Sequence, residues 1–233
     1  MNASVSTSAR PVAADIARCY GQSRSYYWYA RCKLASDPLY AAVLDVCRPL
    51  TSPLLDVGCG VGLLALYLRA GGVSVDYHGV DIDARKIALA RLAAKTSGHT
   101  DVRFESGDVT SIFPSHRGSV ALLDVLQYVD ESARAQLIAR AADCVTANGQ
   151  LILRVGLNDA SWRSTLTRCS DRMQRFARWI LTPPRSQPTR AELIALLTAN
   201  GLRCNFYPLW GRTPFNNWLL VGARSTSELI NSA

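Results

Sequence analysis

The feature that most constrains the fold is a glycine-rich turn. Gly58, Gly60 and Gly62 follow the short apolar run Leu54–Val57 and precede an apolar helical pattern. A short, unbroken apolar run is typical of a parallel strand covered on both faces. Glycines permit a tight turn and a close approach of the backbone to a ligand. The stretch therefore predicts a strand, a ligand-binding turn and a helix whose N-terminus faces the ligand.

The spacing of this turn narrows the choice of ligand. A dinucleotide fingerprint would place its third glycine at position 63, where the chain has Leu63. A phosphate-binding P-loop requires Gly-Lys-Ser/Thr, and the stretch has no lysine. Asp56, just before the first glycine, is unfavourable beside a pyrophosphate but suits a ligand that carries an ammonium group. The turn thus favours a ligand other than a dinucleotide.

With Asp56, Gly58, Gly60 and Gly62, the stretch resembles the first motif, D/E-x-G-x-G-x-G, of the class I S-adenosylmethionine-dependent methyltransferases. The resemblance extends over roughly residues 50–224. It implies S-adenosyl-L-methionine as cofactor, bound in part by these four residues. It also implies an α/β fold: a Rossmann-like, doubly wound sheet, mostly parallel with an antiparallel last strand, and helices on both faces.

A second landmark lies at the end of the second predicted strand, Val73–Val80. Asp81 comes 23 positions after Gly58, and an acid at this place can accept hydrogen bonds from both hydroxyls of a ribose. Asp83 is predicted to cap the next helix, which leaves Asp81 as the ribose ligand. Ile82, between the two acids, is included in the expected cofactor site.

A third landmark follows the third predicted strand, Val102–Phe104. In the family that the chain resembles, this position supplies a carboxylate to the adenine amino group and a backbone contact beside it. Asp108 matches the carboxylate position, and Val109 is expected to lie against the ring.

The candidate catalytic residues follow the fourth predicted strand, Ser119–Leu123. Asp124 stands at its carboxyl end, where open α/β sheets bind ligands, and Tyr128 comes shortly after. Methyl transfer chiefly requires alignment of the reacting atoms, but a hydroxyl or activated carbon also needs a general base. Asp124 and Tyr128 are the expected catalytic residues. His78 and His116 are weaker candidates, because their positions are typical of structural or solvent-facing histidines.

Two stretches bear on the acceptor. After the fourth strand the chain lacks the [DN]-P-P-[YF] motif expected of a nucleic-acid amino methyltransferase, which argues against a nucleic-acid partner. The predicted helix 158–181 is apolar on one face and arginine-rich on another. This suggests a small aromatic or acyl acceptor with a carboxylate, or one tethered to an acidic acyl carrier protein; a solvated helix face is the alternative. The arginines expected to bind the acceptor or its carrier are Arg168, Arg172 and Arg175.

Further acceptor contacts are expected from two aromatic stretches. Residues 16–34 hold an aromatic cluster; in the resembled family the N-terminal segment often closes over cofactor and acceptor, although ordinary packing of an outer helix explains the cluster equally well. The stretches 26–31 and 210–217 are also similar to methyltransferases of bacterial aryl-polyene and related fatty-acid-like biosynthesis. Tyr29 and Asn216 are accordingly placed in the substrate site.

Composition sets the wider limits. With 233 residues, 48% of them hydrophobic and 19% charged, the chain can form one large α/β domain. We expect a flexible N-terminus over 1–14 and one domain over 15–233, with a helical cap at 15–50 and an acceptor-side insertion at 157–188. No apolar stretch approaches the roughly 18 residues of a membrane span, and seven scattered cysteines suit a cytoplasmic protein. The net charge of +8 favours acidic partners.

Three alternatives remain open at this stage. The chain could be a cofactor-binding partner subunit that has lost catalysis, although a complete set of cofactor acids counts against this. A nicotinamide-dependent oxidoreductase is disfavoured by Leu63. A catechol-type O-methyltransferase would hold Mg²⁺ with Asp124, Asn158 and Asp159, but oxygen-ligand sites need close convergence. We expect no metal.

Overall fold

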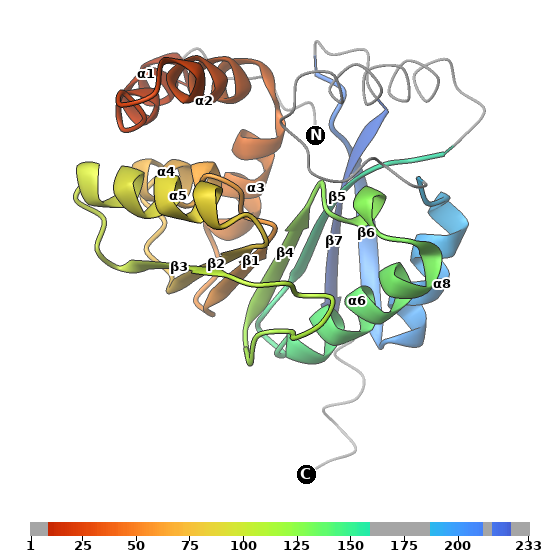
Figure 1. Ribbon diagram of the computed structural model, residues 1–233. Helices are drawn as coiled ribbons and strands as arrows, with labels where there is room; N and C mark the ends of the chain where they lie inside the picture. The colour runs from red at the N-terminus through yellow and green to blue at the C-terminus, as the bar shows by residue number, and fades with distance from the viewer. Residues whose placement is uncertain (1–8, 159–186, 212–215, 225–233) are drawn as a thin grey trace. The chain divides into compact units, whose positions relative to one another are not determined.

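The computed structural model describes residues 9–158, 187–211 and 216–224. The chain divides into two compact units, the first of residues 1–114 with 211–213, the second of residues 115–210 with 214–233. Figure 1 shows their helices and strands. Among the helices that are described, none has the length and apolar character needed to cross a membrane.

The first unit contains three parallel strands in the order β3-β2-β1. Every residue of β1 and β2 is buried, whereas β3 buries only Phe104. In the register, Asp56 lies opposite Gly79 and Val57 opposite Val80, so β1 and β2 end side by side. The strands are β1 (Leu54–Val57), β2 (Tyr77–Asp81) and β3 (Val102–Ser106).

Five helices lie in the described part of the same unit. Helix α5 packs on β2 and β3, and α1 packs on α2 and α4 (Figure 1). The Asp83 side chain accepts a hydrogen bond from the Arg85 amide at the start of α5, which confirms the predicted helix cap. The helices are α1 (Ala9–Arg18), α2 (Arg24–Ser36), α3 (Leu39–Cys47), α4 (Leu63–Ala70) and α5 (Ala84–Thr96).

In the described residues of the second unit there are four strands, in the order β4-β5-β7-β6. Strand β4 runs parallel to β5, and β7 is antiparallel to both β5 and β6. Helix α6 packs on β4, and α8 packs on β6 and α6 (Figure 1). The elements are β4 (Ser119–Leu123), η1 (Leu126–Tyr128), α6 (Glu131–Cys144), β5 (Leu151–Gly156), α8 (Arg190–Ala199), β6 (Leu202–Pro208) and β7 (Asn217–Arg224). The predicted fold class, a mostly parallel Rossmann-like sheet with an antiparallel last strand, is confirmed.

The second strand is shorter than predicted. The sequence pattern placed its start at Val73, but β2 begins at Tyr77. The reason is Arg69, whose guanidinium donates to the carbonyl oxygens of Val73 and Val75 over 2.7 and 2.9 Å. These carbonyls are bonded to a helix side chain, so the apolar residues before Tyr77 form a loop.

Candidate functional site

The turn between β1 and α4 is built on left-handed backbone at all three of its glycines. The φ angles are 77° at Gly58, 57° at Gly60 and 78° at Gly62. The amides of Gly58 and Cys59 both donate to the carbonyl oxygen of Val80, over 2.7 and 3.1 Å. The turn is therefore fixed against the end of β2. Helix α4 starts without a side-chain cap or an acidic residue in its first turn. The amide groups at its N-terminus can therefore donate hydrogen bonds to a bound ligand.

Two of these glycines serve different purposes. A Cβ added at Gly62 would lie 2.8 Å from Cζ of Phe104 and 3.0 Å from Cβ of Ala90, so this glycine lets α5 and β3 pack closely. A Cβ added at Gly60 would meet nothing within 4 Å. The open space beside the backbone is thus at Gly60, which is where a ligand can approach. The turn fits the predicted cofactor cradle in this respect.

Asp81 lies at the end of β2 and binds the backbone of Gly60. Its Oδ2 accepts a hydrogen bond from the Gly60 amide over 2.9 Å, and its Oδ1 accepts one from the Asp83 amide over 2.8 Å. Each carboxylate oxygen has about two lone-pair sites. The side chain is therefore held in place by the protein and can still accept hydrogen bonds from two hydroxyl groups.

The other predicted cofactor residues of this unit are brought to the same edge. Ile82 is 63% exposed beside the buried Asp81 and offers apolar surface to a ring. The Gly107 amide donates to the carbonyl oxygen of Asp81 over 3.1 Å, which ties the loop of Asp108 and Val109 to the end of β2. Asp108 is exposed, and hydrogen bonds from its neighbours, chiefly the Thr110 hydroxyl, lower its pKa.

Asp56 lies deeper than a surface ligand would. The side chain is only 2% exposed, and its carboxylate accepts a hydrogen bond from the Tyr77 hydroxyl. Burial raises the pKa of Asp56 to about 7; the Tyr77 hydrogen bond opposes this shift, and the nearby charge of Asp81 adds to it. This bond ties the carboxylate to Tyr77 on β2. Its contact with a ligand ammonium group stays a prediction.

The N-terminal helices are connected to the turn by a residue that sequence reasoning did not single out. The buried Tyr20 donates from its hydroxyl to the carbonyl oxygen of Val61 over 2.7 Å. The aromatic cluster was noticed in the sequence, but a bond between residues 41 positions apart leaves no local signal. Tyr29, the predicted acceptor contact, lies half-buried on α2.

In the second unit, Asp124 lies at the carboxyl end of β4, as predicted. Its φ of 62° makes it the single non-glycine residue with left-handed backbone in the described part of the chain. Arg154 Nη1 donates to Asp124 Oδ2 over 2.6 Å, and the Asp124 amide donates to the Arg154 carbonyl oxygen over 3.2 Å. Arg154 is only 6% exposed. Sequence reasoning missed it, although a charged residue within the apolar strand β5 was the available signal.

The remaining predicted residues of this unit differ in setting. Tyr128 ends η1 and is half-buried. Asn216 is buried: its Nδ2 donates to the Leu157 carbonyl oxygen over 3.0 Å, and its Oδ1 accepts from Trp218 Nε1 over 3.0 Å. These bonds join the end of β5 to the start of β7. The acceptor contact of Asn216 stays a prediction.

Neither weaker base candidate gains support from its surroundings. His78 contacts Arg103 and Glu105 on β3, and burial together with the Arg103 charge lowers its pKa. His116 Nε2 lies 2.9 Å from the carbonyl oxygen of Ser119.

Several predictions fall on other parts of the chain. Arg168, Arg172, Arg175 and Asp159 lie outside the described residues. Among the described residues, no group of three or more histidine, cysteine or acidic side chains could hold a metal ion.

Comparison with known proteins agrees with this geometry. A family model described as "Methyltransferase domain" matches residues 54–149. The ubiquinone biosynthesis O-methyltransferase of Paracidovorax citrulli is 29% identical over 101 residues, which are 42% of each chain. This chain thus matches less than half the length of that curated relative.

Solved structures share the fold at low sequence identity. Magnesium protoporphyrin IX methyltransferase from Synechocystis PCC 6803, solved with bound SAH, is 20% identical, with a TM-score of 0.59 over 80% of each chain. An O-methyltransferase from neocarzinostatin biosynthesis, solved with S-adenosyl-L-homocysteine and 1,4-dihydroxy-2-naphthoic acid, is 17% identical, with a TM-score of 0.64 over 88% of this chain and 58% of that one. Residues 54–149 thus match a methyltransferase domain, and the fold and the glycine turn agree with the class I, S-adenosyl-L-methionine-dependent type of that domain.

Proposed function

We propose that the protein is an O-methyltransferase that acts on a small aromatic acceptor with a free hydroxyl group. The observation that carries this proposal is the fixed carboxylate of Asp124 at the carboxyl end of β4, 2.6 Å from the buried Arg154. A positioned carboxylate can act as the general base that a hydroxyl acceptor needs. The names of the curated relative and of the naphthoic-acid-bound neighbour support the same class of reaction.

The first unit is proposed to bind the cofactor. Asp81 would accept the two ribose hydroxyls, Asp108 the adenine amino group, and Ile82 and Val109 would lie against the ring. Gly58, Gly60 and Gly62 would bring backbone close to the methionine end, above Asp56. The supporting observations are the open space at Gly60 and the remaining acceptor capacity of Asp81.

When bound, S-adenosyl-L-methionine supplies a methyl group attached to a positively charged sulfur. This sulfur is a good leaving group, so the methyl group is transferred readily. The protein then has to align the acceptor oxygen with that methyl group and exclude water. Asp124 would take the hydroxyl proton as the new oxygen–carbon bond forms. The carbon–sulfur bond would break at the same time, and the electron pair of that bond would remain on sulfur. Arg154 would hold the Asp124 carboxylate in orientation, and Tyr128 would contact the acceptor.

The acceptor is proposed to carry a negative charge, either as its own carboxylate or through an acidic acyl carrier protein. The net charge of +8 supports an anionic partner. Arg168, Arg172 and Arg175 remain the proposed contacts to it, with Tyr29 and Asn216 as further acceptor contacts. We do not propose nucleic acid as the methyl acceptor.

The test uses S-adenosyl-L-methionine with a deuterated methyl group. The full-length protein is incubated with a panel of hydroxybenzoates, dihydroxybenzoates and carrier-tethered acyl chains, and the products are analysed by mass spectrometry. The proposal predicts label on the oxygen of an aromatic acceptor and strongly reduced labelling by Asp124→Asn. Label on nitrogen or carbon only, or equal labelling by Asp124→Asn, would overturn it.

A further inference from the structure

The loop that follows β4 is held by two buried arginines of the second unit. Arg154 on β5 binds Asp124 at the start of this loop. Arg134 on α6 is 1% exposed, and its Nε lies 3.4 Å from the carbonyl oxygen of Leu126, the first residue of η1. The two arginines thus contact the loop at Asp124 and at Leu126, shortly before Tyr128.

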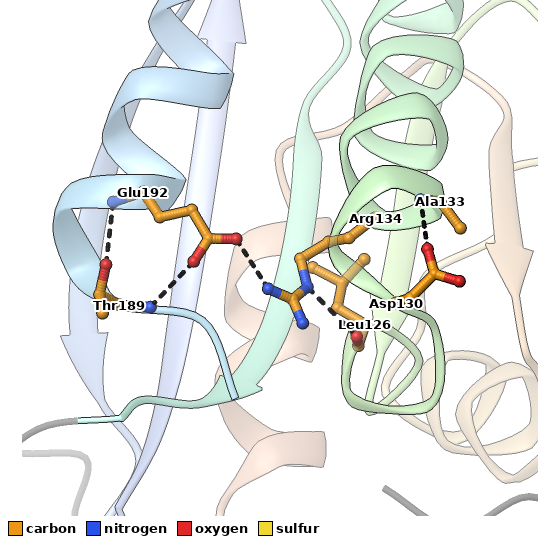
Figure 2. A network of polar contacts seen from close by, with 6 residues as sticks. All are labelled: Leu126, Asp130, Ala133, Arg134, Thr189 and Glu192. Atoms are coloured by element: carbon orange, nitrogen blue, oxygen red, sulfur yellow. Dashed lines mark hydrogen bonds and ion pairs between the residues drawn. The ribbon is translucent and has the colours of Figure 1, made fainter. Parts of the chain in front are cut away.

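Arg134 has an acidic partner on a different helix. Its Nη1 donates to Glu192 Oε1 over 2.7 Å, across 58 positions of sequence. Figure 2 shows the guanidinium of Arg134 between Leu126 and Glu192. A buried charge is tolerated only where such pairing and hydrogen bonding compensate for its desolvation. The bond to Glu192 therefore fixes the orientation in which Arg134 faces the loop.

Glu192 is itself held at the start of α8. Its backbone amide donates a hydrogen bond to the Thr189 hydroxyl oxygen over 3.2 Å, and its Oε2 accepts one from the Thr189 amide over 3.4 Å (Figure 2). This is a capping box. One carboxylate thus serves the helix cap with one oxygen and Arg134 with the other. The far end of the loop is fixed independently, because Asp130 caps α6 through the Ala133 amide over 2.9 Å.

We propose that Arg134, oriented by Glu192, is a positioning residue for methyl transfer: it holds the loop that presents Asp124 and Tyr128 to the acceptor. This inference rests on the proposed function for its catalytic consequence. The structural part stands on the two contacts of Arg134 alone. Arg134 is taken to act through its contact with the backbone of Leu126.

The experiment compares three variants of the full chain. Arg134→Met keeps an unbranched aliphatic stem but removes the guanidinium that contacts Leu126 and Glu192, and Arg134→Lys keeps the charge while losing the forked geometry. Thr189→Ala is the matched control, because it weakens the same helix start without removing a group that binds Arg134. Hydrogen–deuterium exchange of peptides covering 124–130 reports local opening of the loop. Calorimetry measures affinity for S-adenosyl-L-methionine, and 3,4-dihydroxybenzoate is the acceptor probe.

We expect exchange over 124–130 to rise at least tenfold in Arg134→Met and less in Arg134→Lys, but to stay near wild type in Thr189→Ala. Turnover of the probe should fall at least tenfold in Arg134→Met, while cofactor affinity changes less than twofold. Arg134→Lys should recover part of the turnover. If Arg134→Met does not fold, Glu192→Gln is judged by the same criteria.

The inference is overturned if exchange over 124–130 is unchanged in Arg134→Met, or if Thr189→Ala raises it equally. A wild-type protein that leaves the probe unmethylated would count against the proposed acceptor class. The exchange result would still decide whether Arg134 holds the loop, so the two failures are distinguishable.

Discussion

The backbone amide of Gly60 donates a hydrogen bond to Oδ2 of Asp81 over 2.9 Å, across 21 positions of sequence. The carboxylate proposed to bind the ribose therefore also holds the glycine turn. A change at Asp81 should affect both cofactor binding and the local stability of the turn. An exposed acid without these contacts would affect neither.

Replacing Asp81 by alanine should weaken binding of S-adenosyl-L-methionine at least tenfold. The variant removes two charge-assisted hydrogen bonds to the ribose, each worth about 1.5–3 kcal/mol. It also leaves the amides of Gly60 and Asp83 without their carboxylate, so the melting temperature without cofactor should fall. Calorimetry and thermal melts measure the two effects. Asp76→Ala, an exposed acid just before β2, is the control and should change neither.

Alanine substitutions at Gly60 and Gly62 should differ in their main effect: the first should weaken cofactor binding, and the second should lower the stability of the fold. At Gly62 the new methyl would clash with Phe104 at 2.8 Å, so the variant should lose about 2–4 kcal/mol of unfolding free energy from overpacking and left-handed strain. At Gly60 the methyl meets open space, and the strain alone costs about 1–2 kcal/mol. Gly60→Ala should instead lose affinity for the cofactor. Equal destabilisation in urea titrations would contradict this division.

Asp56 should make the protein less stable as pH rises through the range from about 4 to about 7. Its pKa is raised by burial to about 7 in the folded protein, against about 3.9 in the unfolded chain. Between these values the native state keeps a proton that the unfolded state has lost, so unfolding free energy falls with rising pH.

Asp56→Asn cannot titrate and should escape this loss. Its melting temperature, relative to wild type, should therefore increase between pH 5 and pH 8 when measured without cofactor. Asp76→Asn, at an exposed position, should follow the wild-type curve. Parallel curves for Asp56→Asn and wild type would show that Asp56 is charged across this range.

Asp124→Asn should lower turnover of a hydroxyl acceptor on the order of a hundredfold or more, as expected when a general base is lost. The amide can still accept a hydrogen bond from Arg154, so the loop should keep its geometry. Affinity for S-adenosyl-L-methionine should remain within twofold, because the proposed cofactor residues lie in the other unit. Rapid-quench kinetics with a reactive phenol separate chemistry from binding, and an unchanged chemical step would contradict the role of Asp124.

The placement of the proposed cofactor residues at one edge of the sheet could be predicted because the signals for it are local. The turn from Asp56 to Gly62 is one contiguous motif, and Asp81 follows a recognisable strand. The ends of parallel strands β1 and β2 lie side by side by topology, so order along the chain was enough to bring these residues together.

The supporting contacts could not be predicted in the same way. Arg154 and Asp124 are 30 positions apart, and Arg134 and Glu192 are 58 apart. Their pairing depends on strand order and helix packing rather than on periodicity. A local contact can also shorten a strand that the apolar pattern predicts. Arg69 binds the carbonyl oxygens of Val73 and Val75, and β2 begins only at Tyr77.

The most direct test of the account is a calorimetric titration of the full chain with S-adenosyl-L-homocysteine, with NADH titrated in parallel. The account predicts saturable binding of S-adenosyl-L-homocysteine that Asp81→Ala weakens at least tenfold, and no binding of NADH. Binding of NADH with none of S-adenosyl-L-homocysteine would contradict it.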